Sequence, residues 1–138
     1  MTEPLLSVWV PGKPKTKGSL DVVNARRGKA VVRENVVGSK RWRELVRYSI
    51  AGLVAEPVEG PVVVDLLFVL PTDDAAKARS GDIDKLARNI LDALQDAGVY
   101  RDDAQVIRLV AHKIADGDQR GEEASGTGVR IWVWRGRD

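Results

Sequence analysis

The sequence contains no cysteine and only one histidine, His112, among its 138 residues. Without cysteine the chain forms neither a disulfide framework nor a thiolate metal site. A single histidine also excludes any metal or catalytic site that needs two histidines from one chain. A metal site in this protein would therefore be built mainly from the oxygen atoms of acidic side chains.

Long hydrophobic runs are also missing, since no apolar stretch approaches the ~20 residues of a membrane-spanning helix. The first residues, Met1-Thr2-Glu3-Pro4, lack the charged and apolar regions of a secretory signal peptide. We therefore expect a protein of the reducing cytoplasm that does not contact a membrane. A length of 138 residues suits one compact domain, covering residues 1–138, with a single hydrophobic core.

The net charge of +2 hides an uneven distribution of charged residues. Half of the 22 basic residues lie between Lys13 and Arg47, where only three acidic residues accompany them. Between Glu56 and Asp103 the balance reverses, with 11 acidic residues against five basic ones. A basic region attracts a polyanion such as nucleic acid, whereas clustered carboxylates attract a cation. An enzyme that acts on nucleic acid through a metal ion needs both.

The hydrophobic pattern predicts an α+β fold, in which a mostly antiparallel sheet carries two helices on one face. Strands are expected at 5–10, 61–70, 105–114 and 129–135, together with a hairpin of 20–24 and 30–33. Pro and Gly between residues 12 and 18 predict a loop, and the polar stretch 115–128 is expected to be a mobile loop.

Two segments show the 3.6-residue spacing of amphipathic helices. The first begins at Ser39, a favourable N-cap, and extends through Leu53 with Trp42 turned inward. Its basic residues are expected on the outward face: Lys40, Arg41, Arg43 and Arg47. The second runs from Asp84 to Ala97 and is ended by Gly98, which favours a left-handed cap.

Aspartates at the two ends of the second helix are the candidates for a metal site. Asp82 and Asp84 lie where a loop enters the helix, and both favour the positive end of its dipole. Thirteen helical steps from Asp84 to Ala97 advance ~20 Å, and five extended steps from Gly98 to Asp103 recover ~16 Å. If this return runs antiparallel to the helix, Asp103 reaches the first turn and joins the pair.

Such a cluster repels itself unless a counter-charge is present. Oxygen ligands suit Mg²⁺ or Mn²⁺, and the ion would activate a water molecule and stabilise charge on phosphoryl oxygens. A purely structural interpretation stays open as well: Asp82 as an N-cap, Asp84 as a first-turn acid, and Asp102-Asp103 as a polar turn. An Asp-x-Asp pair alone does not decide between the two.

The order of these motifs resembles the RusA family of Holliday junction resolvases, many of which are carried by bacteriophages. The family pattern Asp-x-Asp-Asn-Leu-x-Lys is matched here by Asp82-Ile83-Asp84-Lys85-Leu86-Ala87-Arg88. Its later elements, Asp-Ala-Leu and then Asp-Asp-x-x-Val, are matched by Asp92-Ala93-Leu94 and, after Gly98, by Asp102-Asp103-Ala104-Gln105-Val106. A Gly-x-Pro-x-x-Lys loop near the N-terminus is matched by Gly12-Lys13-Pro14-Lys15-Thr16-Lys17. The ordered combination, spread over residues 5 to about 114, is far more specific than either acidic pair.

The resemblance implies a homodimeric, Mg²⁺-dependent endonuclease of the bacterial cytoplasm, with Mn²⁺ as a substitute ion. It would nick four-way DNA junctions symmetrically in recombination and repair. Asp82, Asp84 and Asp103 would hold the metal, with Asp102 next in line.

Two departures concern the catalytic set, because Lys85 stands where the family has Asn and Arg88 where it has Lys. A guanidinium does not give up its proton, so a proton-donating role of that lysine is vacant or has moved to Lys85. The departures leave two alternatives open: a junction-binding protein without turnover, and a nuclease for other branched DNA.

Basic residues of the N-terminal region are the candidates for DNA contact, namely Lys13, Lys15, Lys17, Arg26 and Arg27. Asp92 is expected to form a supporting salt bridge with Arg88, one helical turn away. His112 is expected on a strand surface, and Trp132 and Trp134 in the core or in a dimer contact. Asp65 interrupts an apolar strand and points either to the site or to solvent.

Overall fold

The computed structural model describes residues 3–17, 20–25, 29–34, 38–71, 81–117 and 126–136. Its centre is a four-stranded sheet in the order β1-β6-β4-β5. The strands are β1 (Leu6–Pro11), β4 (Val62–Leu70), β5 (Val106–Ala115) and β6 (Gly128–Arg135). β6 pairs antiparallel with both β1 and β4, whereas β4 and β5 run parallel. This mixed, mostly antiparallel sheet with its two helices confirms the predicted α+β class.

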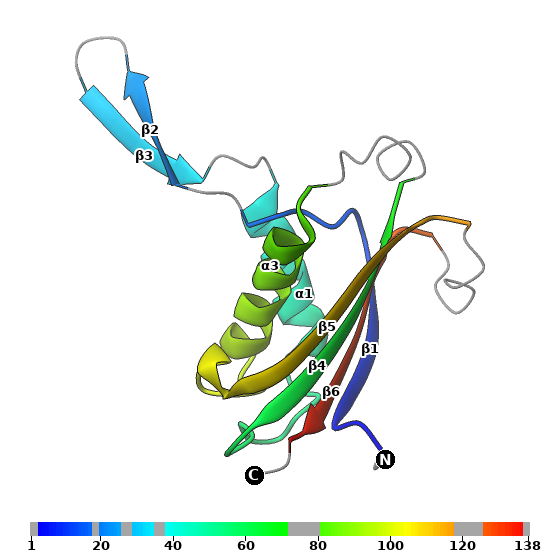
Figure 1. Ribbon diagram of the computed structural model, residues 1–138. Coiled ribbons are helices and arrows are strands. Elements are labelled where there is room, and N and C mark those ends of the chain that lie inside the picture. The colour runs from blue at the N-terminus through cyan, green and yellow to red at the C-terminus, as the bar shows by residue number, and fades with distance from the viewer. Residues whose placement is uncertain are drawn as a thin grey trace.

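Two helices, α1 (Ser39–Ile50) and α3 (Ile83–Asp96), cover one face of the sheet (Figure 1). They pack against each other, and α1 also contacts β1 while α3 contacts β5. The central strand β4 buries Val62, Val64 and Leu66 in alternation, as a strand beneath helices must. The core therefore lies between the helices and the sheet, and none of the described residues forms a helix over the opposite sheet face (Figure 1).

A separate hairpin joins β2 (Leu20–Ala25) to β3 (Lys29–Glu34), which pair antiparallel with each other and not with the main sheet. This confirms the hairpin predicted at 20–24 and 30–33. Arg26 and Arg27, expected to contact DNA, lie outside the described residues, as does most of the expected loop at 115–128.

The first helix differs from its prediction at both ends. Its N-cap is Gly38, whose φ of 82° lies in the left-handed region that glycine adopts easily, and Ser39 is already buried. The helix ends at Ile50, so Leu53 lies outside it and is exposed. Trp42 is buried as predicted. The prediction of an outward Arg43 is wrong, because this side chain turns toward α3 and donates to Asn89.

Candidate functional site

Asp82 and Asp84 lie at the N-terminal end of α3, and both are exposed. Asp82 is the N-cap residue, with an extended backbone at φ −72° and ψ 134°, and its side chain makes no capping hydrogen bond. The structural interpretation of Asp82 as a side-chain cap is therefore not realised. Its carboxylate remains available at the positive end of the helix dipole, which favours negative charge and a bound phosphate alike.

The loop Gly12–Lys17 is fastened along the same end of α3. The backbone N–H of Lys17 donates to the carbonyl of Lys85 at 3.0 Å, and its Nζ lies 2.6 Å from Asp92 Oδ2. Thr16 packs so closely on Gly81 that a Cβ there would meet its Cγ2 at 2.3 Å. The expected salt bridge of Asp92 therefore exists, but its partner is Lys17 of the loop and not Arg88.

Asn89 is the centre of a buried polar network that the sequence analysis missed. Its side chain is fully buried, and its Nδ2 donates to the carbonyl of Lys15 and to Ser39 Oγ, both at 3.0 Å. Its Oδ1 accepts from Arg43 Nη1 at 2.7 Å. One amide thus joins the N-terminal loop, α1 and α3. The available signal was a polar residue at a position that the helical period turns inward, three residues after buried Leu86.

Asp103 is not at this end of α3, so the predicted return to the first turn is wrong. Its backbone N–H donates to Gln95 Oε1 at 3.0 Å, and Gln95 lies 11 helical steps, about 16 Å, after Asp84. The chain does not reverse along the helix at residues 98–103. Val99 and Tyr100 are held beside residue 58 instead, and β5 makes the return (Figure 1).

Asp102 and Asp103 begin the short 3₁₀ helix η1 (Asp103–Gln105). The Asp102 carboxylate accepts from the N–H of Ala104 at 2.8 Å and forms a capping box with Gln105. Gln105 in turn donates to the carbonyls of Val58 and Gly60, both at 2.8 Å. Among the described residues, no group of three or more acidic or histidine side chains is close enough to hold a metal ion. One chain alone therefore does not form the expected three-carboxylate site.

The residue that β5 carries back to the start of α3 is Lys113, whose Nζ donates to the carbonyl of Gly81 at 3.0 Å. This places an ammonium group next to the residue that precedes Asp82. No local pattern in the sequence points to Lys113, because its position depends on the parallel pairing of β4 and β5. Of the two departures from the family pattern, Lys85 is half-buried and Arg88 is exposed.

Tyr100 lies at the other end of α3, where its hydroxyl donates to the carbonyl of Leu91 at 2.7 Å. Burial raises the pKa of Tyr100 far above its ordinary value, and the negative charges of Asp103 and Asp92 raise it further. The phenol therefore stays protonated and acts as a fixed donor, which ties the segment after α3 to the helix.

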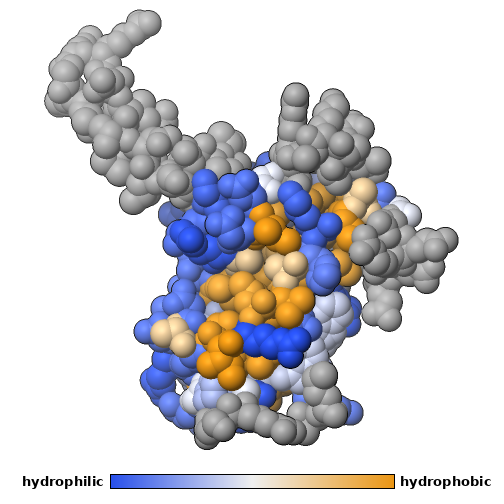
Figure 2. All heavy atoms as spheres, viewed as in Figure 1, coloured by the Kyte–Doolittle hydropathy of each residue, from blue (hydrophilic) through white to orange (hydrophobic). Residues whose placement is uncertain are grey.

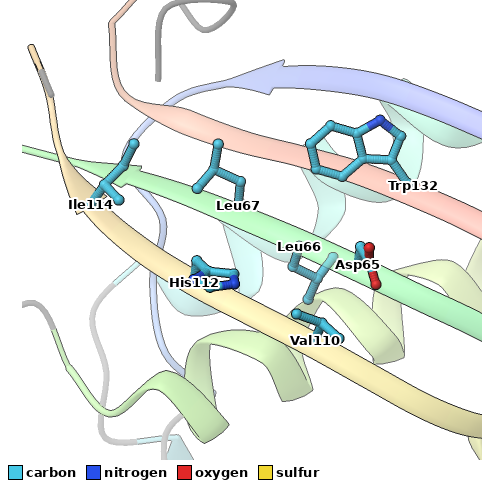
Figure 3. A pocket seen from close by; sticks show the side chains of 7 residues that line it. All are labelled: Asp65, Leu66, Leu67, Val110, His112, Ile114 and Trp132. Atoms are coloured by element: carbon cyan, nitrogen blue, oxygen red, sulfur yellow. The ribbon is translucent and has the colours of Figure 1, made fainter. Parts of the chain in front are cut away.

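A hollow lies on the sheet face away from the helices, with a cavity volume of about 270 Å³ (Figure 3). Asp65 and Trp132 point into it from neighbouring strands, and His112 lies at its edge on β5, exposed as expected. Asp65 pairs in register with Val110 and Trp132, so it belongs to this face and not to the Asp82 site. Trp134 shares the same face by strand alternation.

Along the described residues, no helix combines the length and apolar character needed to cross a membrane. No curated protein matches the chain. The family model for the endodeoxyribonuclease RusA matches residues 11–130, which include the N-terminal loop, both helices and all acidic motifs. This family comprises endonucleases that resolve Holliday junctions. Since the match covers most of the chain, the protein belongs to the RusA endodeoxyribonuclease family.

Proposed function

We propose that this protein is a Mg²⁺-dependent endonuclease that resolves four-way DNA junctions by paired, symmetric nicks in recombination and repair. The observation that carries the proposal is the Asp82 carboxylate. It is exposed at the N-terminus of α3, makes no capping bond, and lies within the matched region of a nuclease family. A carboxylate used only for local structure would be engaged by the helix it precedes.

Asp82 and Asp84 are the residues that would hold the metal ion. Mg²⁺ in nucleotide-processing sites is usually bound through one or two carboxylates, with water and substrate phosphate completing its shell. The ion, when bound, would stabilise charge on the reacting phosphate. Asp103, with Asp102 beside it, is the proposed third carboxylate, although in a single chain it lies at the other end of α3.

The basic residues around this end of α3 would position DNA. Lys13 and Lys15 lie on the loop that Asn89 and Lys17 fasten to the helix, so the loop can present positive charge to a phosphate without moving. Arg26 and Arg27 remain proposed DNA contacts on the strength of their charge in the sequence alone. Lys85 and Arg88 remain candidates for the cationic role that the family assigns to its lysine. Lys113 joins them, because its Nζ donates to the carbonyl of Gly81, the residue before Asp82.

The test is cleavage of a labelled four-way junction in Mg²⁺, in Mn²⁺ and with a chelator, by wild type and Asp82→Asn. We expect a loss of cutting of about 100-fold or more for the variant, with junction binding retained or tightened. Asp96→Asn, the same chemical change at an exposed residue of the same helix, is the matched control and should cut like wild type. Unchanged cutting by Asp82→Asn, or cutting that survives chelation, would remove the proposal.

Arg88 at the family's lysine position keeps a non-catalytic junction-binding protein as the second candidate. In that case wild type binds the junction but does not nick it in either metal. Comparison of four-way junctions with flaps and plain duplex separates junction resolution from cleavage of other branched DNA.

A further inference from the structure

The sheet face opposite the helices carries a row of side chains that crosses all four strands. By the strand register, Trp132 of β6 lies between Ser7 of β1 and Asp65 of β4. Val110 of β5 is the next residue in this row. Asp65 and Trp132 line the hollow of about 270 Å³, and Leu67 and Val110 add apolar surface to it (Figure 3). Pockets for drug-sized ligands begin at ~300 Å³, so this hollow suits a smaller group of one or two fused rings.

Asp65 has no protein partner in this hollow. Its side chain is half-buried and forms no hydrogen bond or ion pair with any described residue. A carboxylate accepts hydrogen bonds at both oxygens, and it loses hydration where apolar side chains surround it. A ligand that stacks on Trp132 and donates N–H groups to Asp65 would supply the missing donors.

A nucleobase combines these two properties. It is a planar aromatic ring that stacks on an indole, and adenine, cytosine and guanine carry an exocyclic amino group that can donate to a carboxylate. Guanine also has a ring N–H beside its amino group, so it can donate to both oxygens of one carboxylate. Inside a duplex these N–H groups are paired and the ring faces are stacked. Only an unpaired and unstacked base can therefore enter the hollow.

The charges on this sheet face suit the phosphates on either side of such a base. Among the described residues of the four strands, the face carries two guanidinium groups and one carboxylate, those of Arg108, Arg130 and Asp65. Arg130 lies over the Trp132 ring, 5.6 Å from its centroid, and its Nη2 donates to Ser7 Oγ at 2.9 Å. Because Arg130 does not line the hollow, it holds the indole from outside and leaves the side toward Asp65 open.

The chemistry of this face differs from that on the other side of β5. Figure 2 shows hydrophobic residues gathered over the region that α3 and β5 occupy in Figure 1. The hollow instead combines an aromatic ring, a carboxylate and the imidazole of His112, with a guanidinium group beside them. Such a mixture favours a polar aromatic ligand over an apolar protein surface.

We propose that the hollow binds one unpaired base of a DNA strand and that it prefers guanine. The base stacks on Trp132 and donates to Asp65, while Arg108 and Arg130 attract the phosphates on either side. The inference rests on the proposed function for the choice of DNA as the ligand, but it does not depend on metal binding or cleavage.

The hollow lies at the same level of β5 as the proposed catalytic site. His112 at its edge directly precedes Lys113, and successive residues of a strand point to opposite faces. On the helix side, Lys113 reaches the carbonyl of Gly81, the residue before Asp82. The two sites are therefore on opposite faces of one strand, and a single branched DNA molecule can occupy both.

The test measures the binding of labelled single strands in a chelator, so that no cutting occurs. Each strand is all thymine except for one central base: guanine, adenine, cytosine or hypoxanthine. We expect the guanine strand to bind most tightly and the hypoxanthine strand, which lacks the amino group, to bind about 5-fold more weakly. Trp132→Leu keeps apolar cover but removes the ring, and should weaken binding of the guanine strand about 10-fold. Trp134→Leu, the same change on the same strand face but outside the hollow, is the matched control and should bind like wild type.

Asp65→Asn keeps the shape of the side chain but replaces one acceptor oxygen by a donor. It should abolish the preference for guanine over hypoxanthine. Removal of a negative charge raises the affinity for every strand, so the ratio between the two strands is the readout and not the affinity itself. Urea unfolding checks that each variant is folded. If Trp132→Leu does not fold, the ratio measured with Asp65→Asn decides the test alone.

The outcomes separate this inference from the proposed function. A wild type that binds all strands equally, or an Asp65→Asn variant that keeps the preference for guanine, would overturn the base-binding hollow and leave the nuclease proposal intact. Equal losses for Trp132→Leu and Trp134→Leu would overturn it too, because they would indicate a general contact with the sheet. A wild type that shows the expected preference but never nicks a junction in Mg²⁺ would overturn the proposed function alone.

Discussion

The network around Asn89 makes a quantitative prediction, because one side chain holds the N-terminal loop, α1 and α3 together. Replacing Asn89 by Ala removes three hydrogen bonds at once and leaves Ser39, which is also fully buried, without that partner. The helix itself should tolerate the change, since alanine has the higher helix propensity. Any loss of stability must therefore come from the network.

The loss of stability expected for Asn89→Ala can be worked out from the three hydrogen-bond partners of Asn89. The bond from the Arg43 guanidinium is charge-assisted and contributes about 1.5–3 kcal/mol, and the two neutral bonds contribute about 1 kcal/mol each. Arg43 and the carbonyl of Lys15 are only partly buried, so in the variant water can replace some of the hydrogen bonds that they made to Asn89. The higher helix propensity of alanine offsets roughly 0.6 kcal/mol of this loss. We therefore expect Asn89→Ala to lower the free energy of unfolding by roughly 2 to 3 kcal/mol.

Urea unfolding followed by tryptophan fluorescence measures this change. At an m value near 2 kcal/mol per molar, the midpoint should fall by roughly 1 to 1.5 M with the slope unchanged. Trypsin should also cut after Lys15 and Lys17 faster in the variant, because the loop opens locally more often. Asp96→Ala, at an exposed position of the same helix, serves as control and should stay within about 0.5 kcal/mol of wild type. A loss below about 1 kcal/mol for Asn89→Ala, or one no larger than the control, would refute the reasoning.

Three further predictions concern the same region. A double-mutant cycle of Lys17→Met and Asp92→Asn should give a coupling of about 1 kcal/mol or less, because the side chains are 40% and 23% exposed and solvent screens the pair. Gly81→Ala should lower the free energy of unfolding by roughly 2 kcal/mol and strongly reduce junction cutting. The reason is that Gly81 has a φ of 91° and that a Cβ there would collide with Thr16 beside Asp82. An active and stable Gly81→Ala variant would show that this contact is dispensable. Burial and the nearby carboxylates raise the pKa of Tyr100, so wild type should lose stability above pH 10.0, by up to about 1.4 kcal/mol per pH unit. Tyr100→Phe should remove that part of the slope in unfolding experiments between pH 9 and about 11.

Most elements of the fold could be predicted from local patterns in the sequence. The strand β4, the amphipathic helix α3 and the pairing of β2 with β3 all follow from residue types within a few positions, and each was predicted. The errors at α1 arise where a tertiary contact outweighs a local preference. Ser39 is a good N-cap in isolation, but its hydroxyl accepts from Asn89, 50 residues later, and Gly38 makes the turn instead. Arg43 turns inward for the same partner.

The position of Asp103 could not be predicted from the sequence, for a different reason. Counting residues gives the length of the return after α3 but not its direction, and the direction is set by contacts with a distant segment. Val99 and Tyr100 are held at Val58, and Gln105 anchors η1 to the carbonyls of residues 58 and 60, so the chain cannot reverse before β5. The acidic motifs of the family pattern therefore lie at opposite ends of α3, at levels about 16 Å apart along the helix axis.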